Sequence, residues 1–230
     1  MQTTRTGRSQ TGPDAHASPA ISRRTRVVWC AFAAAMTLGC GLLLALDSRP
    51  VPRSDGLAMP ALVAAAPSNF IEAIFKTRVG AIEPGRWQSI VIHHSGQAAG
   101  SPASIARDHE AHNLRGLGHH FVIGNGAGMD DGEVHVGYRW LDQLPGAHAA
   151  GTNGDWYNLN AISICLVGDG NRRPFTDAQI GRLNQLVEAL ARELKIPRSQ
   201  IVLHSDIAPA SDPGVLFPAA RFQQTLDAVR

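Results

Sequence analysis

The stretch IVIHHSG, Ile90–Gly96, is a short apolar run rich in β-branched residues that ends in two histidines. Such a run is typical of a strand buried inside a sheet. A second run, IVLHS at Ile201–Ser205, has the same pattern and also reaches a histidine. Because a sheet fixes the backbone and leaves the strand ends open, a strand end is a good place to mount a ligand. The two runs therefore predict one site at the edge of a sheet.

The rest of the globular part alternates between strand and helix patterns. Further strands are expected in His119–Gly126, Gly132–Trp140 and Ala161–Asp169, and the last, a continuous apolar run, is the candidate central strand. Helices are expected in Ser101–Gly116, Thr176–Ile196 and Pro218–Val229. Interleaved strands and helices predict an α/β (α+β layered) fold, with a mixed central β-sheet and helices packed on it.

A carboxylate follows the second histidine-bearing run. Asp212 comes after His204, and the Ala208–Pro209 turn between them would return the chain toward that histidine. Two histidines and one carboxylate leave the fourth position of a tetrahedral zinc ion free for water, as a catalytic site requires. Spacing alone therefore points to a zinc site without proving it.

The charge distribution argues against nucleic acid as a partner. Of the 21 basic and 19 acidic side chains, the first 26 residues hold five arginines and one acid, Asp14. The remainder of the chain is therefore slightly acidic and offers no basic surface for phosphates. Only Cys165 lies in the globular part, so no disulfide is expected within it.

An apolar segment, Val27–Leu46, follows the basic tail of residues 1–26. Twenty residues in a helix span about 30 Å, the thickness of a bilayer core. An uncleaved transmembrane signal anchor fits best, and the preceding arginines place the globular domain outside the cytoplasm, in the periplasm or cell envelope. A cleaved signal peptide and a lipoprotein signal ending at Cys40 are the alternatives.

The composition predicts a linker with a short pre-domain segment over residues 47–83, and the compact domain over 84–230.

Several motifs occur in the order typical of one family: IHHS, GLGHHFVIGNG, GAHAAG, NAISICLVGD with FTDAQI, and HSDIAPASDPG. The chain resembles the type 2 N-acetylmuramoyl-L-alanine amidases and peptidoglycan recognition proteins from about Ile90 to Phe217. The resemblance implies Zn²⁺ held by His93, His204 and Asp212. It also implies hydrolysis of the amide bond between N-acetylmuramic acid and L-alanine, with peptidoglycan or muropeptides as the partner. His93 is chosen over His94 because the family ligand opens the His-x-Ser pattern.

The chain departs from the family at its catalytic helpers. His119 stands where many members have tyrosine, Ala210 where many have lysine, and Cys165 where others have glutamate. Since imidazole both donates and accepts protons near neutrality, we expect His119 to replace the tyrosine and His148 to assist in proton transfer. His120 is expected to be a packing or supporting group.

His94, Trp140, Trp156 and Tyr157 are expected to contact substrate, because the aromatic residues fall in stretches that read as loops. His109 and His112 share one face of the early helix, where hydrogen-bonding or surface roles are expected.

The alternative function is a membrane-tethered peptidoglycan-binding module with little or no catalysis. A zinc amidase acting on another acyl-peptide is a third reading. The sequence does not indicate an oligomeric state.

Overall fold

The structure is a computed structural model that describes residues 24, 28–32, 34, 36–37, 57–59 and 72–228. The chain divides into two compact units, Met1–Arg53 and Ser54–Arg230. Within the described residues, no helix combines the length and the apolar character that crossing a bilayer requires. Most of the predicted span Val27–Leu46 lies outside the described residues, so the membrane anchor stays a prediction.

The second unit is built on a mixed six-stranded sheet whose strands run in the order β1-β4-β3-β5-β2-β6. The strands are β1 (Leu57–Met59), β2 (Ser89–His94), β3 (Phe121–Ile123), β4 (Val134–Val136), β5 (Ala161–Leu166) and β6 (Ile201–Leu203). Four neighbouring strands are parallel to one another: β3, β5, β2 and β6. Strand β4 pairs antiparallel with β3, and β1 pairs antiparallel with β4. The predicted mixed sheet and the central place of the Ala161 strand are confirmed.

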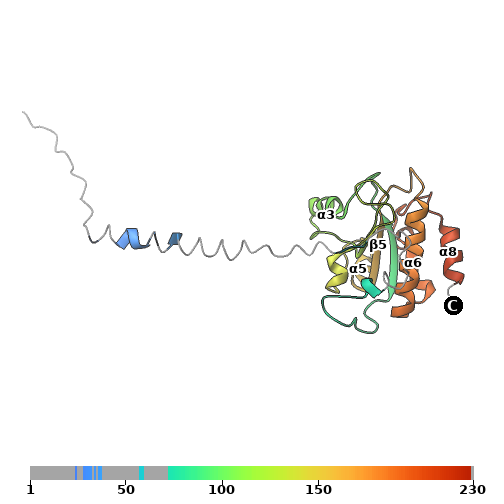
Figure 1. Cartoon of the computed structure of the whole chain (residues 1–230), viewed down its shortest axis with the longest axis horizontal. Helices are drawn as coiled ribbons and strands as arrows, with labels where there is room; N and C mark the ends of the chain where they lie inside the picture. The colour runs from blue at the N-terminus through green and yellow to red at the C-terminus, as the bar shows by residue number, and fades with distance from the viewer. Residues whose placement is uncertain are drawn as a thin grey trace, which may run out of the picture. The chain divides into compact units, whose positions relative to one another are not determined.

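Helices pack on both faces of this sheet, with α6 and α8 on one side of β5 and α3 and α5 on the other (Figure 1). The helices are α3 (Pro102–Ala111), α4 (Tyr138–Leu141), α5 (Gly154–Asn160), α6 (Asp177–Leu194), α7 (His204–Ile207) and α8 (Ala219–Ala228). Thr176 caps α6, and its side chain and that of Gln179 form the predicted capping box. Ser101 caps α3 in the same way, but α3 ends at Ala111, before the predicted Gly116.

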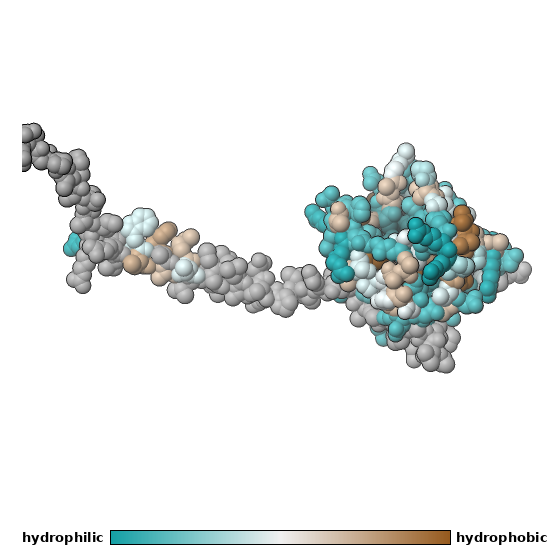
Figure 2. Space-filling model, turned by 90° about the horizontal axis from the view of Figure 1, so that it is seen from above, coloured by the Kyte–Doolittle hydropathy of each residue, from teal (hydrophilic) through white to brown (hydrophobic). Residues whose placement is uncertain are grey.

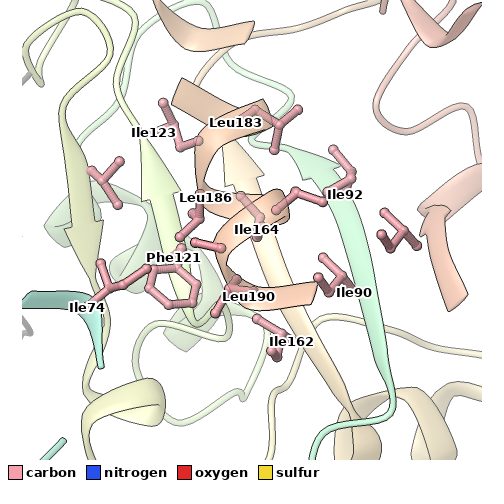
Figure 3. Packing of buried hydrophobic residues seen from close by; sticks show 14 of the residues in the cluster. Ile74, Ile90, Ile92, Phe121, Ile123, Ile162, Ile164, Leu183, Leu186 and Leu190 are labelled. Carbon is pink, nitrogen blue, oxygen red and sulfur yellow. The ribbon is translucent and has the colours of Figure 1, made fainter. Parts of the chain in front are cut away.

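The alternation of side chains along the strands gives the sheet one apolar face and one face that mixes apolar with polar side chains. The face toward α6 is a continuous apolar core that includes Ile92 of β2, Ile164 of β5 and Leu186 of α6 (Figure 3). On the opposite face, β2 and β5 present His93, Ser163 and Cys165, all buried. The outer surface seen from above is mostly hydrophilic, with apolar residues in small groups (Figure 2). The buried polar side chains of this second face, His93 and Ser163, are therefore the ones that need a chemical explanation.

One prediction of local structure is wrong. The expected strand Gly132–Trp140 ends at Val136, because Gly137 caps a short helix, α4, that carries Trp140 into the core. A Cβ atom at Gly137 would lie 2.8 Å from the His119 carbonyl oxygen, so only glycine allows this close approach.

The range 47–83, expected to hold a linker and a short pre-domain segment, contains residues of the folded unit. Leu57–Met59 pairs with β4 as the edge strand β1. Ile74 is fully buried in the core, and its carbonyl oxygen accepts a 2.5 Å hydrogen bond from Trp140 Nε1. Arg78 forms an ion pair with Asp142 at 3.2 Å. The compact unit therefore begins before residue 84.

Leu183 and Leu159 provide a matched test of this core. Leu183 is fully buried on α6, whereas Leu159 on α5 is 53% exposed. We expect Leu183→Ala to lower the free energy of unfolding by about 2–5 kcal/mol, because the substitution leaves a cavity. Leu159→Ala should cost less than about 1 kcal/mol. Urea denaturation of both variants measures the difference, and equal losses would contradict the placement of α6.

Candidate metal centre

His93, His204 and Asp212 converge at the carboxyl ends of β2 and β6. The two strands are parallel neighbours, with Ile92 opposite Leu203, so the next residue of each chain segment emerges at the same edge. His93 Nδ1 lies 2.9 Å and His204 Nδ1 lies 3.0 Å from Asp212 Oδ2. One potential ligand atom from each of the three residues lies within 4.8 Å of the others. The predicted convergence of these side chains is therefore present in the structure.

The main chain fixes the carboxylate of Asp212. The backbone N–H of His94 donates a 2.5 Å hydrogen bond to Oδ1, so Oδ2 is the oxygen left for the two imidazoles. The backbone N–H of Ser205 donates to the Asp212 carbonyl oxygen at 2.7 Å. The side chain of His94 faces the loop after β5, where its Nδ1 accepts a 3.0 Å hydrogen bond from the Gly170 N–H. His94 thus supports the scaffold of the site through Nδ1, and its contact with substrate stays a prediction.

Two glycines allow the loop after β5 to pack against the loop that carries Asp212. A Cβ atom at Gly170 would lie 2.0 Å from the Pro213 carbonyl oxygen, and one at Gly214 would lie 2.2 Å from the Gly170 carbonyl carbon. Gly214 also has a φ of +102°, a backbone conformation that favours glycine. The Leu216 N–H donates to the Gly170 carbonyl oxygen at 2.8 Å. This backbone contact sets the position of Asp212.

The electrostatics of the centre favour an anionic Asp212 beside a neutral His93. Burial raises the pKa of Asp212, but the adjacent His204 and His93 outweigh that effect and hold the pKa below its ordinary value. Burial lowers the pKa of His93, although its contact with Asp212 opposes the shift. Deprotonated ligands are the forms that bind a metal ion.

Buried nitrogens without hydrogen bonds supply the test of whether a metal fits. His204 Nδ1 lies 3.0 Å from Asp212 Oδ2, but neither Nδ1 nor Nε2, both buried, has a partner with hydrogen-bond geometry within the described residues. Leaving a buried polar atom unpaired costs about 1–3 kcal/mol, and ligation of a cation would remove that cost. Two imidazoles and one carboxylate suit Zn²⁺ in both type and number. The residues present therefore fit a catalytic zinc ion.

Three further histidines surround these ligands. His148 Nδ1 lies 3.0 Å from His93 Nε2, and the His119 and His93 rings lie 5.1 Å apart. Burial lowers the pKa of His148 and of His119 well below the ordinary value, and the neighbouring imidazoles add to both shifts. Burial also lowers the pKa of His120 to about 3. The rings are therefore neutral, and hydrogen bonds, not charge, determine their roles.

Comparisons with known proteins agree with this geometry. Residues 83–215, a range that contains all three candidate ligands, match the family described as N-acetylmuramoyl-L-alanine amidase. The chain belongs to the N-acetylmuramoyl-L-alanine amidase family. It is 31% identical over 138 residues to the endolysin of Enterobacteria phage T3, covering 55% of this chain and 80% of that protein.

Two solved structures from Clostridium intestinale URNW share the fold. The endolysin amidase LysCS superposes with a TM-score of 0.52 and is 25% identical, covering 62% of this chain and 84% of LysCS. The amidase LysC gives the same TM-score and identity, covering 62% of this chain and 86% of LysC. These relatives place the described unit, from β2 to the Asp212 loop, within the amidase fold.

The structure corrects one predicted substrate contact of this amidase family member, that of Trp140, and the contact of Trp156 with substrate stays a prediction. Trp140 is fully buried, so it cannot line a groove. Trp156 lies on α5, not in a loop, and lines a cavity beside Gln88 and Gln200, which precede β2 and β6. That cavity is at the opposite end of the sheet from the metal centre. Tyr157 packs against Trp156 with ring centroids 4.9 Å apart, and its contact with substrate stays a prediction.

The other predicted side chains have defined partners. His109 Nδ1 accepts a 2.9 Å hydrogen bond from the Gly118 N–H, and His112 Nδ1 donates to the Asp108 carbonyl oxygen at 2.7 Å, as expected for supporting roles. His120 Nδ1 accepts from the Ser163 N–H, and its Nε2 donates to the Leu144 carbonyl oxygen, both at 3.0 Å. These contacts agree with the supporting role predicted for His120.

Sequence reasoning misses two polar residues close to the histidines. Ser163 Oγ lies 2.6 Å from His119 Nδ1. Asn158 Oδ1 accepts hydrogen bonds from the backbone N–H groups of His148 and Ala149. A serine inside an apolar strand pattern is the one signal that marks a buried polar contact, whereas Asn158 carries no local signal.

Gly170 and Gly181 test whether loop packing positions the ligands. Gly170→Ala should displace the Asp212 loop and weaken Zn²⁺ binding by about 10–100-fold, the range seen when support for a ligand is lost. At Gly181, on α6, a Cβ atom would meet nothing within 4 Å, so Gly181→Ala should leave Zn²⁺ affinity unchanged. Competition titration against a chromophoric chelator measures both. An unchanged affinity in Gly170→Ala would contradict the role assigned to this contact.

Proposed function

We propose that this protein is a zinc-dependent N-acetylmuramoyl-L-alanine amidase that hydrolyses the bond between N-acetylmuramic acid and L-alanine in peptidoglycan. The observation that carries the proposal is the convergence of His93, His204 and Asp212, in which His204 Nδ1 lies 3.0 Å from Asp212 Oδ2 without hydrogen-bond geometry. Membership of the amidase family supplies the reaction and the class of substrate.

Bound Zn²⁺ would polarise the scissile carbonyl and lower the pKa of a bound water from 15.7 to about 7. The protein contributes fixed ligands. Oδ1 of Asp212 is occupied by the His94 N–H at 2.5 Å, so the carboxylate cannot rotate freely. His93 Nε2 faces His148 Nδ1 at 3.0 Å, and a proton shared along that contact keeps the His93 Nδ1 lone pair toward Asp212 and the metal position. His148 thus supports a ligand through Nδ1, and its part in proton transfer stays a prediction.

His119 is the side chain that we assign to the reacting carbonyl. Its ring lies beside His93, and only 5% of the residue is exposed. Cys165, where other members have glutamate, is fully buried, and burial raises the pKa of its thiol well above the ordinary value. Cys165 therefore cannot act as a proton acceptor. We assign hydrogen bonding and proton transfer at the centre to the neutral histidines instead.

A cavity of about 500 Å³ is our candidate for the peptide arm of the substrate. It lies where β2, β3 and β5 end, and its walls include Asn125, Arg173 and the ion pair of Arg172 with Asp169 at 3.2 Å. The Gly168 N–H in its wall donates a 3.0 Å hydrogen bond to Ser95 Oγ, in the turn directly after His94. Stem peptides carry carboxylates, which Arg173 would pair with.

The alternative is a binding module without turnover, and the replaced helpers Ala210 and Cys165 favour it. Incubating the full-length protein with muropeptides separates the two functions. We expect release of free stem peptide, detected by mass spectrometry, that stops with chelator and returns with Zn²⁺. Retention on sacculi without any release would contradict the amidase proposal and select the binding module.

Asp212→Asn tests the metal ligand itself. The substitution keeps the shape of the side chain but removes the charge, so we expect loss of stoichiometric Zn²⁺ and a fall in turnover of at least about 10²-fold. Asp142→Asn is the matched control, because Asp142 is paired with Arg78 away from the centre. Metal content and hydrolysis rate are measured on both variants. Full activity in Asp212→Asn would contradict the ligand assignment.

We also propose that Val27–Leu46 anchors the domain to the membrane with the enzyme outside the cytoplasm. The proposal rests on the charge-free apolar sequence and the preceding arginines. The full-length chain should remain in the membrane fraction after alkaline carbonate extraction, whereas a variant lacking residues 27–46 should not. Release of the full-length chain by carbonate would contradict the anchor.

A further inference from the structure

Ser163 lies on β5, on the face of the sheet that carries the metal centre. It is fully buried and is paired in register with Val91, two residues before His93. Its three polar groups all contact the two histidines that precede β3. Ser163 Oγ lies 2.6 Å from His119 Nδ1, its N–H donates to His120 Nδ1 at 3.0 Å, and its carbonyl oxygen accepts from the His120 N–H at 3.1 Å.

The direction of the hydrogen bond between Ser163 and His119 follows from the hydroxyl group. Within the described residues, His119 Nδ1 is the one hydrogen-bond partner of Ser163 Oγ. A serine hydroxyl has one hydrogen to donate, and burying that hydrogen without an acceptor costs free energy. Ser163 Oγ–H therefore donates to Nδ1, which must be unprotonated. A neutral His119 then carries its hydrogen on Nε2.

The other ring nitrogen of His119 is available to a ligand. Within the described part of the chain, Nε2 makes no hydrogen bond. It is also not fully buried, so a ligand can reach it. The His93 and His148 rings lie 5.1 Å and 6.3 Å from the His119 ring, so the ring stands beside the metal ligands.

We propose that Ser163 is a positioning residue that fixes His119 as the Nε2–H tautomer, so that His119 offers a hydrogen-bond donor, and not a base, to the reaction centre. The inference rests on the proposed amidase function. In that reaction the scissile carbonyl oxygen gains negative charge as water adds to the carbon, and a fixed N–H donor stabilises that charge. No proton leaves His119 in this step. A tyrosine hydroxyl at this position would supply the same type of donor.

The tautomer is tested directly by ¹⁵N NMR of the full-length, Zn²⁺-loaded protein labelled at histidine. Two-bond couplings to the ring protons distinguish a protonated from an unprotonated nitrogen, and the His119→Gln variant assigns the signals. We expect a protonated Nε2 and an unprotonated Nδ1 in the wild type. In Ser163→Ala, the Nδ1 signal should shift because its donor is lost. A protonated Nδ1 in the wild type, or an Nδ1 signal unmoved by Ser163→Ala, overturns the proposal.

Kinetics test the consequence for catalysis. Ser163→Ala should lower kcat by about 10–100-fold with little change in KM, and Ser163→Thr, which keeps the hydroxyl, should recover most of the loss. Ser89→Ala is the matched control, because Ser89 is also a fully buried strand serine whose hydroxyl donates to the Gln200 carbonyl oxygen at 2.7 Å. Its kcat should equal that of the wild type.

An equal fall in kcat for Ser89→Ala and Ser163→Ala would show a general effect of a lost buried hydrogen bond and would overturn the proposal. If the wild type releases no stem peptide, the amidase function fails, and the NMR result alone decides the tautomer. The two failures are therefore distinguishable.

Discussion

The centre depends on one carboxylate that the backbone holds in place. Asp212 accepts from the His94 N–H through Oδ1 and turns Oδ2 toward His93 and His204. This arrangement requires β2 and β6 to be neighbours and requires the loop after β5 to approach the Asp212 loop at Gly170 and Gly214. The sheet order and the two close backbone contacts thus determine the positions of the three ligand atoms.

Burial gives the surrounding histidines their chemical character. In a buried site the charged form of imidazole is disfavoured, so His119, His120 and His148 remain neutral, and each ring nitrogen is either a donor or an acceptor. The structure assigns a neighbour to most of these nitrogens: Ser163 to His119, Leu144 to His120, and His93 to His148. We propose that this fixed hydrogen-bond pattern takes the place of the tyrosine that many members of the family have at position 119.

Much of the fold was predictable because it depends on local patterns. The apolar runs of β2 and β5, and the capping box of Thr176 with Gln179, are signals within a few residues, and the structure has those elements where they are expected. The convergence of His93, His204 and Asp212 was predictable once two strands ending in histidine were recognised. Trp140 was misplaced because its burial depends on Gly137 and on Ile74, which is distant in sequence. Ser163 and the scaffold role of His94 were missed because their partners, His119 and Gly170, come from other segments.

The central claim is that three protein groups hold one divalent cation and leave a position open for water. X-ray absorption spectroscopy at the zinc edge, on the stoichiometrically loaded full-length protein, tests this claim most directly. The account predicts two imidazole nitrogens and one carboxylate oxygen at about 2.0–2.2 Å, with one further light-atom ligand that an added inhibitor anion replaces. A sulfur ligand at about 2.3 Å, which would implicate Cys165, or a fourth protein ligand that no anion displaces, would contradict it.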